Sequence, residues 1–165
     1  MAEEMNPLHE LLVDELKDLY NAENQIIKAL PRMAKKANNE QLRRAFETHL
    51  QETRGQAERL EQIAQEMDFS LRGKKCKAME GLVEEAQDMM SEHDDPEVLD
   101  AGLIAAAQRV EHYEIAGYGT VKTFADHLDL GDAKSLLDKT LDQESKADKL
   151  LTQLAENSIN VEAMQ

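Results

Sequence analysis

Residues 101–128 read AGLIAAAQRVEHYEIAGYGTVKTFADHL, and core-type side chains recur there at alternating steps of three and four residues. This spacing averages 3.5 residues and is typical of the buried seam of a helix that packs in a bundle. The seam positions are Ile104, Ala107, Glu111, Glu114, Tyr118, Val121, Ala125 and Leu128. Two carboxylates therefore occupy consecutive core positions of an otherwise mainly apolar helix.

Start and stop signals divide the rest of the chain into further helices. Asn6-Pro7 and Asp95-Pro96 each combine an N-cap side chain with a proline that suits the first turn, and Gly131 is expected to end a helix as its left-handed C′ residue. We expect long helices over residues 7–37, 40–67, 96–128 and 132–157, and a short helix over 76–92. Two tight hairpins joined by a long connection predict an all-α four-helix bundle with one long crossover that carries the short helix.

Composition restricts the function further. The 165 residues suit a single domain over 1–165, and 34 Asp+Glu against 19 Lys+Arg give a net charge of −15, which argues against nucleic-acid binding. The longest uncharged run, residues 101–108, is too short to cross a membrane. One Cys excludes an internal disulfide, and the stretch Met1–Glu4 lacks the features of a secretory signal. We therefore expect a cytoplasmic protein with no membrane contact.

The other three long helices also carry acidic residues in or beside their seams, close to mid-helix. They are Glu23 in the first, Glu52 in the second, and Glu144 with Asp148 one turn later in the fourth. At about 1.5 Å per residue from the connecting turns, Glu23 reaches the height of Glu52, and Glu114 that of Asp148. Six carboxylates from four helices are thus expected to converge, with His49 on the seam of the second helix beside them.

Six carboxylates in a dry core repel one another and lose their hydration, so they need protons, basic partners or cations. Two metal ions would offset most or all of this charge. Oxygen ligands with one imidazole suit iron, or alternatively manganese. Two simpler interpretations stay open: a single seam Glu that pairs with Lys or Arg, and a hydrogen-bonded core role for His49. Cys76 is expected to pack in the core, with a redox role as the alternative.

Four motifs resemble the YciF-type stress proteins of bacteria. They are LKDLYNAE (16–23), HLQET (49–53), KCKAMEGL (75–82) and VEHYEIA (110–116), in this order along the chain. The resemblance covers almost the whole sequence. It implies a ferritin-like fold, a homodimer and a role in the stress response.

The wider ferritin-like class, and rubrerythrins in particular, holds two irons between its four helices. Matched by position, Glu23, Glu52, Glu111, Glu114 and Glu144 correspond to the carboxylate ligands of that class. The sequence departs from the class at its two usual histidines, where it has Gly55 and Asp148. His49 and Gln56 are the residues available to compensate.

The resemblance and the seam pattern together predict oxidation of Fe(II), or reduction of O2 or peroxide, at this centre. In this interpretation Glu52 and Glu144 bridge the metals, Glu23 and Glu111 bind terminally, and the remaining two carboxylates complete the coordination sphere. The main alternative is a non-catalytic dimeric helical stress protein that acts through protein–protein contacts. Iron storage is a third interpretation, since a charge of −15 attracts cations.

Overall fold

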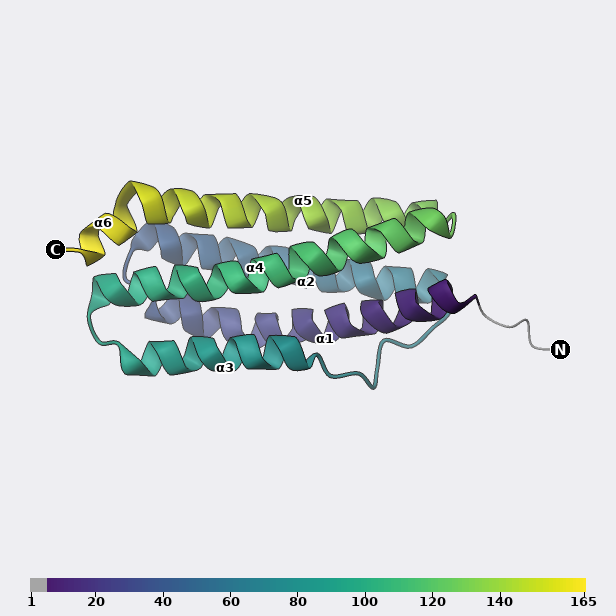
Figure 1. Ribbon diagram of the computed structural model, residues 1–165, viewed down its shortest axis with the longest axis horizontal. Coiled ribbons are helices and arrows are strands. Elements are labelled where there is room, and N and C mark those ends of the chain that lie inside the picture. Colours follow the sequence, from purple (N-terminus) through teal and green to yellow (C-terminus); the bar gives the residue numbers. More distant parts are fainter. Residues whose placement is uncertain (1–5) are drawn as a thin grey trace.

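The computed structural model describes residues 6–165, whose regular elements are all helices (Figure 1). The stretch Met1–Glu4, which was expected to lack a secretory signal, lies outside the described residues. Four long helices lie side by side: α1 (Pro7–Lys36), α2 (Glu40–Glu66), α4 (Pro96–His127) and α5 (Gly131–Leu154). The connection between α2 and α4 carries α3 (Lys77–Glu92), and α5 continues through a π-helical turn (Ala155–Ile159) into the short α6 (Asn160–Ala163). The prediction of a four-helix bundle with one long crossover is confirmed.

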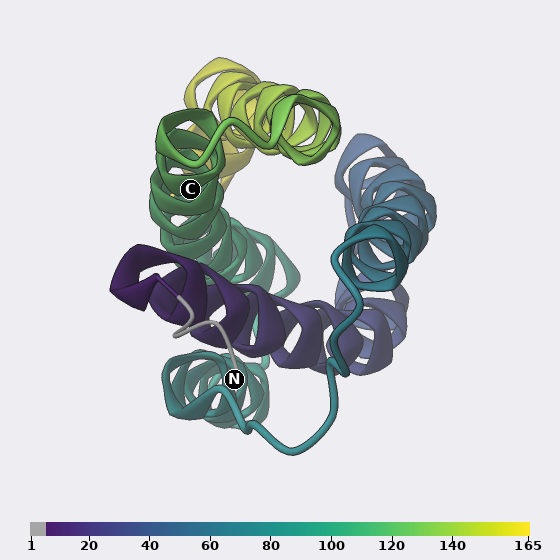
Figure 2. The same ribbon diagram turned by 90° about the vertical axis from the view of Figure 1, so that its right-hand side faces the viewer.

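The long helices surround one common interior, and α3 packs outside it against α1 and α4 (Figure 2). Within residues 6–165, no helix is both long and apolar enough to span a membrane. The buried interior is therefore the space in which functional side chains from different helices can meet.

The predicted N-caps are confirmed by hydrogen bonds. The Asn6 side chain accepts from the backbone N–H of Leu8 at 2.9 Å, and Asp95 accepts from two N–H groups of the first turn of α4. Asn39 caps α2 in the same way. Each side chain satisfies a donor that the first turn of a helix leaves free, which fixes where the helix begins.

The prediction that Gly131 ends α4 is wrong. The left-handed position after α4 is taken by Asp129, with φ of 57°, and Gly131 is the first residue of α5. Asp68 adopts the same conformation after α2, with φ of 56°. A short polar side chain tolerates this backbone region better than other non-glycine residues do, so Asp can replace glycine at a helix end.

The core consists of two apolar clusters with a polar layer between them. The cluster near the α1–α2 turn includes Ile26, Leu30, Phe46, Leu103 and Leu151, and the cluster at the opposite end of the bundle includes Leu12, Leu16, Leu60, Tyr118 and Leu137. Apart from Asp100, the buried polar residues of the long helices lie at the boundary between these two sets. The polar layer therefore lies between two apolar clusters that hold the four helices together on either side of it.

Asp100 on α4 ties the α1–α2 turn to the third long helix. It is buried, and its carboxylate accepts from the backbone N–H groups of Asn38 and Asn39 at 2.8 and 2.7 Å. We expect Asp100→Ala to lower the free energy of unfolding by about 2–4 kcal/mol, since two donors lose a charged acceptor. Thermal denaturation should show a fall in Tm of roughly 5–15 °C. Asp95→Ala, at an exposed cap, is the control and should cost only about 1 kcal/mol; equal losses would contradict the special role of Asp100.

Candidate metal centre

Buried side chains from all four long helices meet in the polar layer. They form two groups that share one residue: His49, Glu111 and Glu144, and Glu23, Glu114 and Glu144. Within each group the potential ligand atoms all lie within 4.8 Å of one another, and all five residues are buried. Glu144 is the only one of the five that belongs to both groups, so its carboxylate lies where it can contact two ions.

Most polar atoms of this cluster lack hydrogen-bond partners. Eight buried atoms are unsatisfied: one oxygen each of Glu23 and Glu111, both oxygens of Glu114 and Glu144, and both ring nitrogens of His49. His49 Nε2 does lie 2.7 Å from Glu111 Oε1, but the pair lacks hydrogen-bond geometry. Buried polar atoms without partners are rare in proteins because each costs about 1–3 kcal/mol. Their oxygen-rich chemistry, with one imidazole, fits two hard or borderline metal ions.

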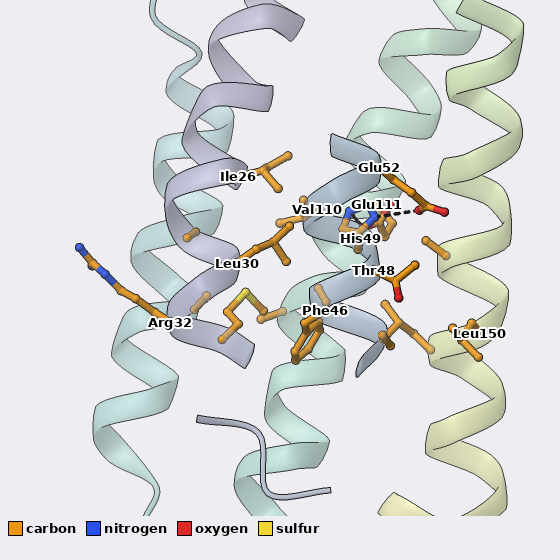
Figure 3. Close-up of a pocket in the computed structure, with 18 of the residues that line it drawn as sticks. Ile26, Leu30, Arg32, Phe46, Thr48, His49, Glu52, Val110, Glu111 and Leu150 are labelled. Carbon is orange, nitrogen blue, oxygen red and sulfur yellow. Dashed lines mark ion pairs between the residues drawn. The ribbon is translucent and has the colours of Figure 1, made fainter. Parts of the chain in front are cut away.

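Glu52 lies at the edge of the cluster and not within it. Its side chain is 33% exposed, and its nearer oxygen lies 3.6 Å from His49 Nδ1. Figure 3 shows Glu52 above His49, on the same face of α2. Glu52 can therefore reach the imidazole, while His49 occupies the inner position.

Asp148 lies apart from both groups. Its carboxylate is 3.2 Å from His112 Nε2 and 3.3 Å from the side-chain amide nitrogen of Gln108. Four residues correspond to 400° of rotation along a helix, so Asp148 lies about 40° around α5 from Glu144. That rotation turns it toward the outer edge of α4. The structure thus brings together five of the seven predicted residues and leaves Glu52 and Asp148 outside.

A second layer of polar side chains surrounds the five. Tyr118 donates a 2.7 Å hydrogen bond to Glu23 Oε1, and the Thr53 hydroxyl donates to the backbone carbonyl of His49. Gln56 is fully buried, and its carbonyl oxygen has no partner. Gln56 is a residue that the sequence indicated as available to compensate for the missing histidines. Thr53 is a seam position of α2 that the polar periodicity could also have assigned to the site.

Cys76 is buried, as packing requires, but it is also hydrogen-bonded. Its thiol lies 3.1 Å from the Tyr113 hydroxyl, which donates in turn to Asp18. The Cys76 sulfur also accepts from the backbone N–H of Met79 at the start of α3. These contacts hold α3 against α1 and α4 beside the centre.

Burial shifts the proton affinities of the cluster. Desolvation raises the pKa of Glu23 to about 7, and it raises the pKa values of Glu114 and Glu144 well above normal. Desolvation lowers the pKa of His49, but the Glu111 carboxylate outweighs it and the net pKa lies well above normal. For Glu111, desolvation acts upward, yet contact with Glu144 and the His49 charge brings its pKa below normal. Without cations, the cluster therefore holds protons on carboxyl groups and an imidazolium beside Glu111.

The metal-free protein should lose stability as the pH rises. A carboxyl whose folded pKa is raised binds more protons in the folded than in the unfolded state, so its contribution is fully present below pH 4.5 and disappears as the pH passes its folded pKa, about 7 for Glu23. We expect Glu23→Gln to remove up to about 3 kcal/mol of this loss between pH 4.5 and 8. Chemical denaturation of the chelator-treated variant and wild type at several pH values measures the free energy of unfolding of each. Parallel stability curves for the variant and the wild type would contradict the assignment.

Comparison with known proteins supplies an independent line of evidence. The family described as a domain of unknown function, DUF892, matches residues 7–164. The chain is 45% identical to protein YciF of Escherichia coli over 160 residues, 96% of each chain. The crystal structure of that stress protein superimposes with a TM-score of 0.90, covering 94% of this chain and 99% of the other. YcfI of Rhodopseudomonas palustris, described as a candidate structural protein, gives a TM-score of 0.86 at 39% identity over 92% and 97% of the two chains. A Xanthomonas campestris protein with a TM-score of 0.73 is 20% identical over 90% of each chain and shares the fold.

Proposed function

This chain belongs to the DUF892 family, and from that membership and the buried cluster we propose that it is a stress protein with a di-metal carboxylate centre. The metals would be two iron ions, or alternatively manganese. The observation that carries the proposal is the set of eight buried nitrogen and oxygen atoms that lack hydrogen-bond partners and belong to two adjoining groups of potential ligands. Family membership itself agrees with the resemblance to YciF-type proteins that the sequence indicated.

The two groups suggest which residues would hold each ion. His49 and Glu111 would bind one ion, Glu23 and Glu114 the other, and Glu144 both. This assignment differs from the one expected from sequence, in which Glu52 shared the bridging role. Because Glu52 is partly exposed and lies outside both groups, we assign it to the entrance of the site.

Two Fe(II) ions, when bound, would supply two electrons, enough to reduce O2 to hydrogen peroxide or hydrogen peroxide to water, and would become Fe(III) in the same step. The protein's own residues prepare the site for this chemistry. The Tyr118 hydroxyl fixes the orientation of Glu23, and the Glu52 carboxylate lies beside the His49 ring on the solvent side. The net charge of −15 attracts cations toward the molecule.

The proposal is tested by metal content and by oxidation in one preparation. Protein purified without chelator is analysed for metals, then loaded anaerobically with Fe(II), exposed to O2 or peroxide, and followed by absorbance. We expect two metals per chain and a rapid absorbance change. Glu144→Gln should lose both, while Glu58→Gln, at an exposed site on α2, should behave as the wild type. Fewer than one metal per chain, with a Tm that chelator does not change, would reject the proposal.

One observation favours the non-catalytic alternative. The His49 ring beside Glu111 and the raised pKa values of Glu114 and Glu144 allow protons to balance much of the buried charge. In that case the polar layer would be a structural element of a dimeric protein that acts through protein contacts. Metal analysis separates the two functions, because only the first requires ions.

A further inference from the structure

A cavity of about 490 Å³ extends from the cluster into the half of the bundle near the α1–α2 turn (Figure 3). His49, Glu52 and Glu111 form part of its wall at one end. The rest of its wall is mainly apolar, with Leu30 and Phe46 among the side chains that line it. Its volume falls in the range of cavities that bind small organic molecules.

The cavity is elongated along the bundle. Its lining residues on α2 extend from Gln41 to Glu52, which corresponds to roughly 16 Å at the rise of an α-helix. This length and the apolar wall suit an extended alkyl chain. A compact polar molecule would leave most of the wall without contacts.

Charge at the opening favours an anionic end on such a chain. Arg44 on α2 and Lys146 on α5 line the cavity and are exposed, although the protein as a whole carries −15. Their ion pairs with Glu40 and Asp142 involve side chains that are more than 60% exposed, so these pairs are weak and exchangeable. Glu52 interacts with Lys146, whereas Arg44 lies eight residues before Glu52 on α2, roughly 12 Å along the helix, so Arg44 is the cation that the carboxylates of the cluster offset least.

We propose that this cavity binds a medium-chain alkyl carboxylate, with the chain along the apolar wall and the carboxylate at Arg44 and Lys146. The proposal concerns the cavity alone and does not require metal in the cluster. A second copy of this chain is the other candidate occupant. It fits less well because Leu30, Phe46 and Val110 are buried inside the molecule, and Leu150, 44% exposed, is the exposed large apolar side chain at the opening. A flat protein surface could cover the opening without filling the cavity.

Isothermal titration of chelator-treated protein with dodecanoate, below the concentration at which it forms micelles, tests the proposal. We expect one site per chain and a negative heat-capacity change, as apolar burial requires. Butanoate, whose chain is too short to cover the wall, should not bind detectably. Glu144→Gln should bind dodecanoate as the wild type does, which separates this result from the outcome of the metal experiments.

Two pairs of variants locate the ligand. Ala147→Trp fills the opening and should abolish binding, while Ala105→Trp, at an exposed site on α4 outside the cavity, should not change it. Arg44→Gln with Lys146→Gln should weaken binding at least tenfold. The control pair Arg54→Gln with Lys149→Gln removes equal charge from the same two helices away from the cavity and should have little effect.

Three results would overturn the proposal. They are the absence of dodecanoate binding, unchanged binding in Ala147→Trp, and equal losses in the two charge-removal pairs. If the wild type fails to bind and Ala147→Trp also weakens self-association in sedimentation experiments, a second copy covers the opening and the ligand assignment is wrong.

Discussion

Glu144→Gln is expected to abolish metal binding and, at the same time, to stabilise the metal-free protein. Glu144 belongs to both ligand groups, so one substitution removes an oxygen anion from each ion. Burial raises the pKa of this carboxyl well above normal, which means that the folded state carries the cost of keeping it desolvated. Replacing a buried ionisable group by a neutral one of similar volume is often neutral or stabilising, by about 1–4 kcal/mol.

Elemental analysis and thermal denaturation measure the two effects. At pH 8 in chelator, we expect Tm of the variant to exceed that of the wild type by roughly 2–15 °C, and metal content to fall from two per chain to none. Glu58→Gln controls for the loss of one surface charge. A variant that still binds two ions, or that is less stable than the wild type in chelator, would refute the shared role of Glu144.

Metal loading should stabilise the wild-type protein strongly. An ion present at a hundred times its Kd adds about 2.7 kcal/mol, so two ions add roughly 5 kcal/mol and raise Tm by roughly 10–20 °C. The shift should be larger at pH 7.5 than at pH 5.5, because the ions must displace protons from Glu114 and Glu144, whose pKa values are raised by burial.

Asp148→Asn distinguishes the structure from the expectation based on sequence. Because Asp148 contacts His112 and lies outside both ligand groups, we expect this variant to keep nearly all of the metal-induced shift. Differential scanning calorimetry with and without metal provides the comparison. If Asp148→Asn loses as much of the shift as Glu144→Gln does, Asp148 is a ligand after all.

The fold was predictable because each level of the sequence agrees with it. Seam periodicity located four helices, and Asn6 and Asp95 marked where two of them begin. The end of α4 was missed because Asp129, and not Gly131, takes the left-handed position. Backbone conformation at a turn depends on local hydrogen bonds that composition does not reveal.

The convergence of side chains in the candidate site could be predicted from the sequence where the residues lie on a seam. All five converging residues occupy strict seam positions, including His49, whose role the sequence left open. Glu52 lies beside the seam of the second helix, about 60° around the axis from His49, and Asp148 shares the next seam position of the fourth helix with Ala147, about 40° around the axis from Glu144. These rotations direct both side chains to an edge of the cluster. The cavity could not be foreseen, because its wall comes from five helices and no local sequence pattern encodes the distances between them.

The position of the polar layer also affects how the molecule moves. The apolar side chains on either side of the layer form separate clusters, so each end of the bundle is stabilised by its own cluster. The polar layer between them adds little stability, because most of its polar atoms lack hydrogen-bond partners. Amide hydrogen exchange in the metal-free protein should accordingly divide α1, α2, α4 and α5 into two blocks with different opening free energies. Ions bound at the junction would connect these blocks, so the protein would report metal occupancy through the cooperativity of its unfolding.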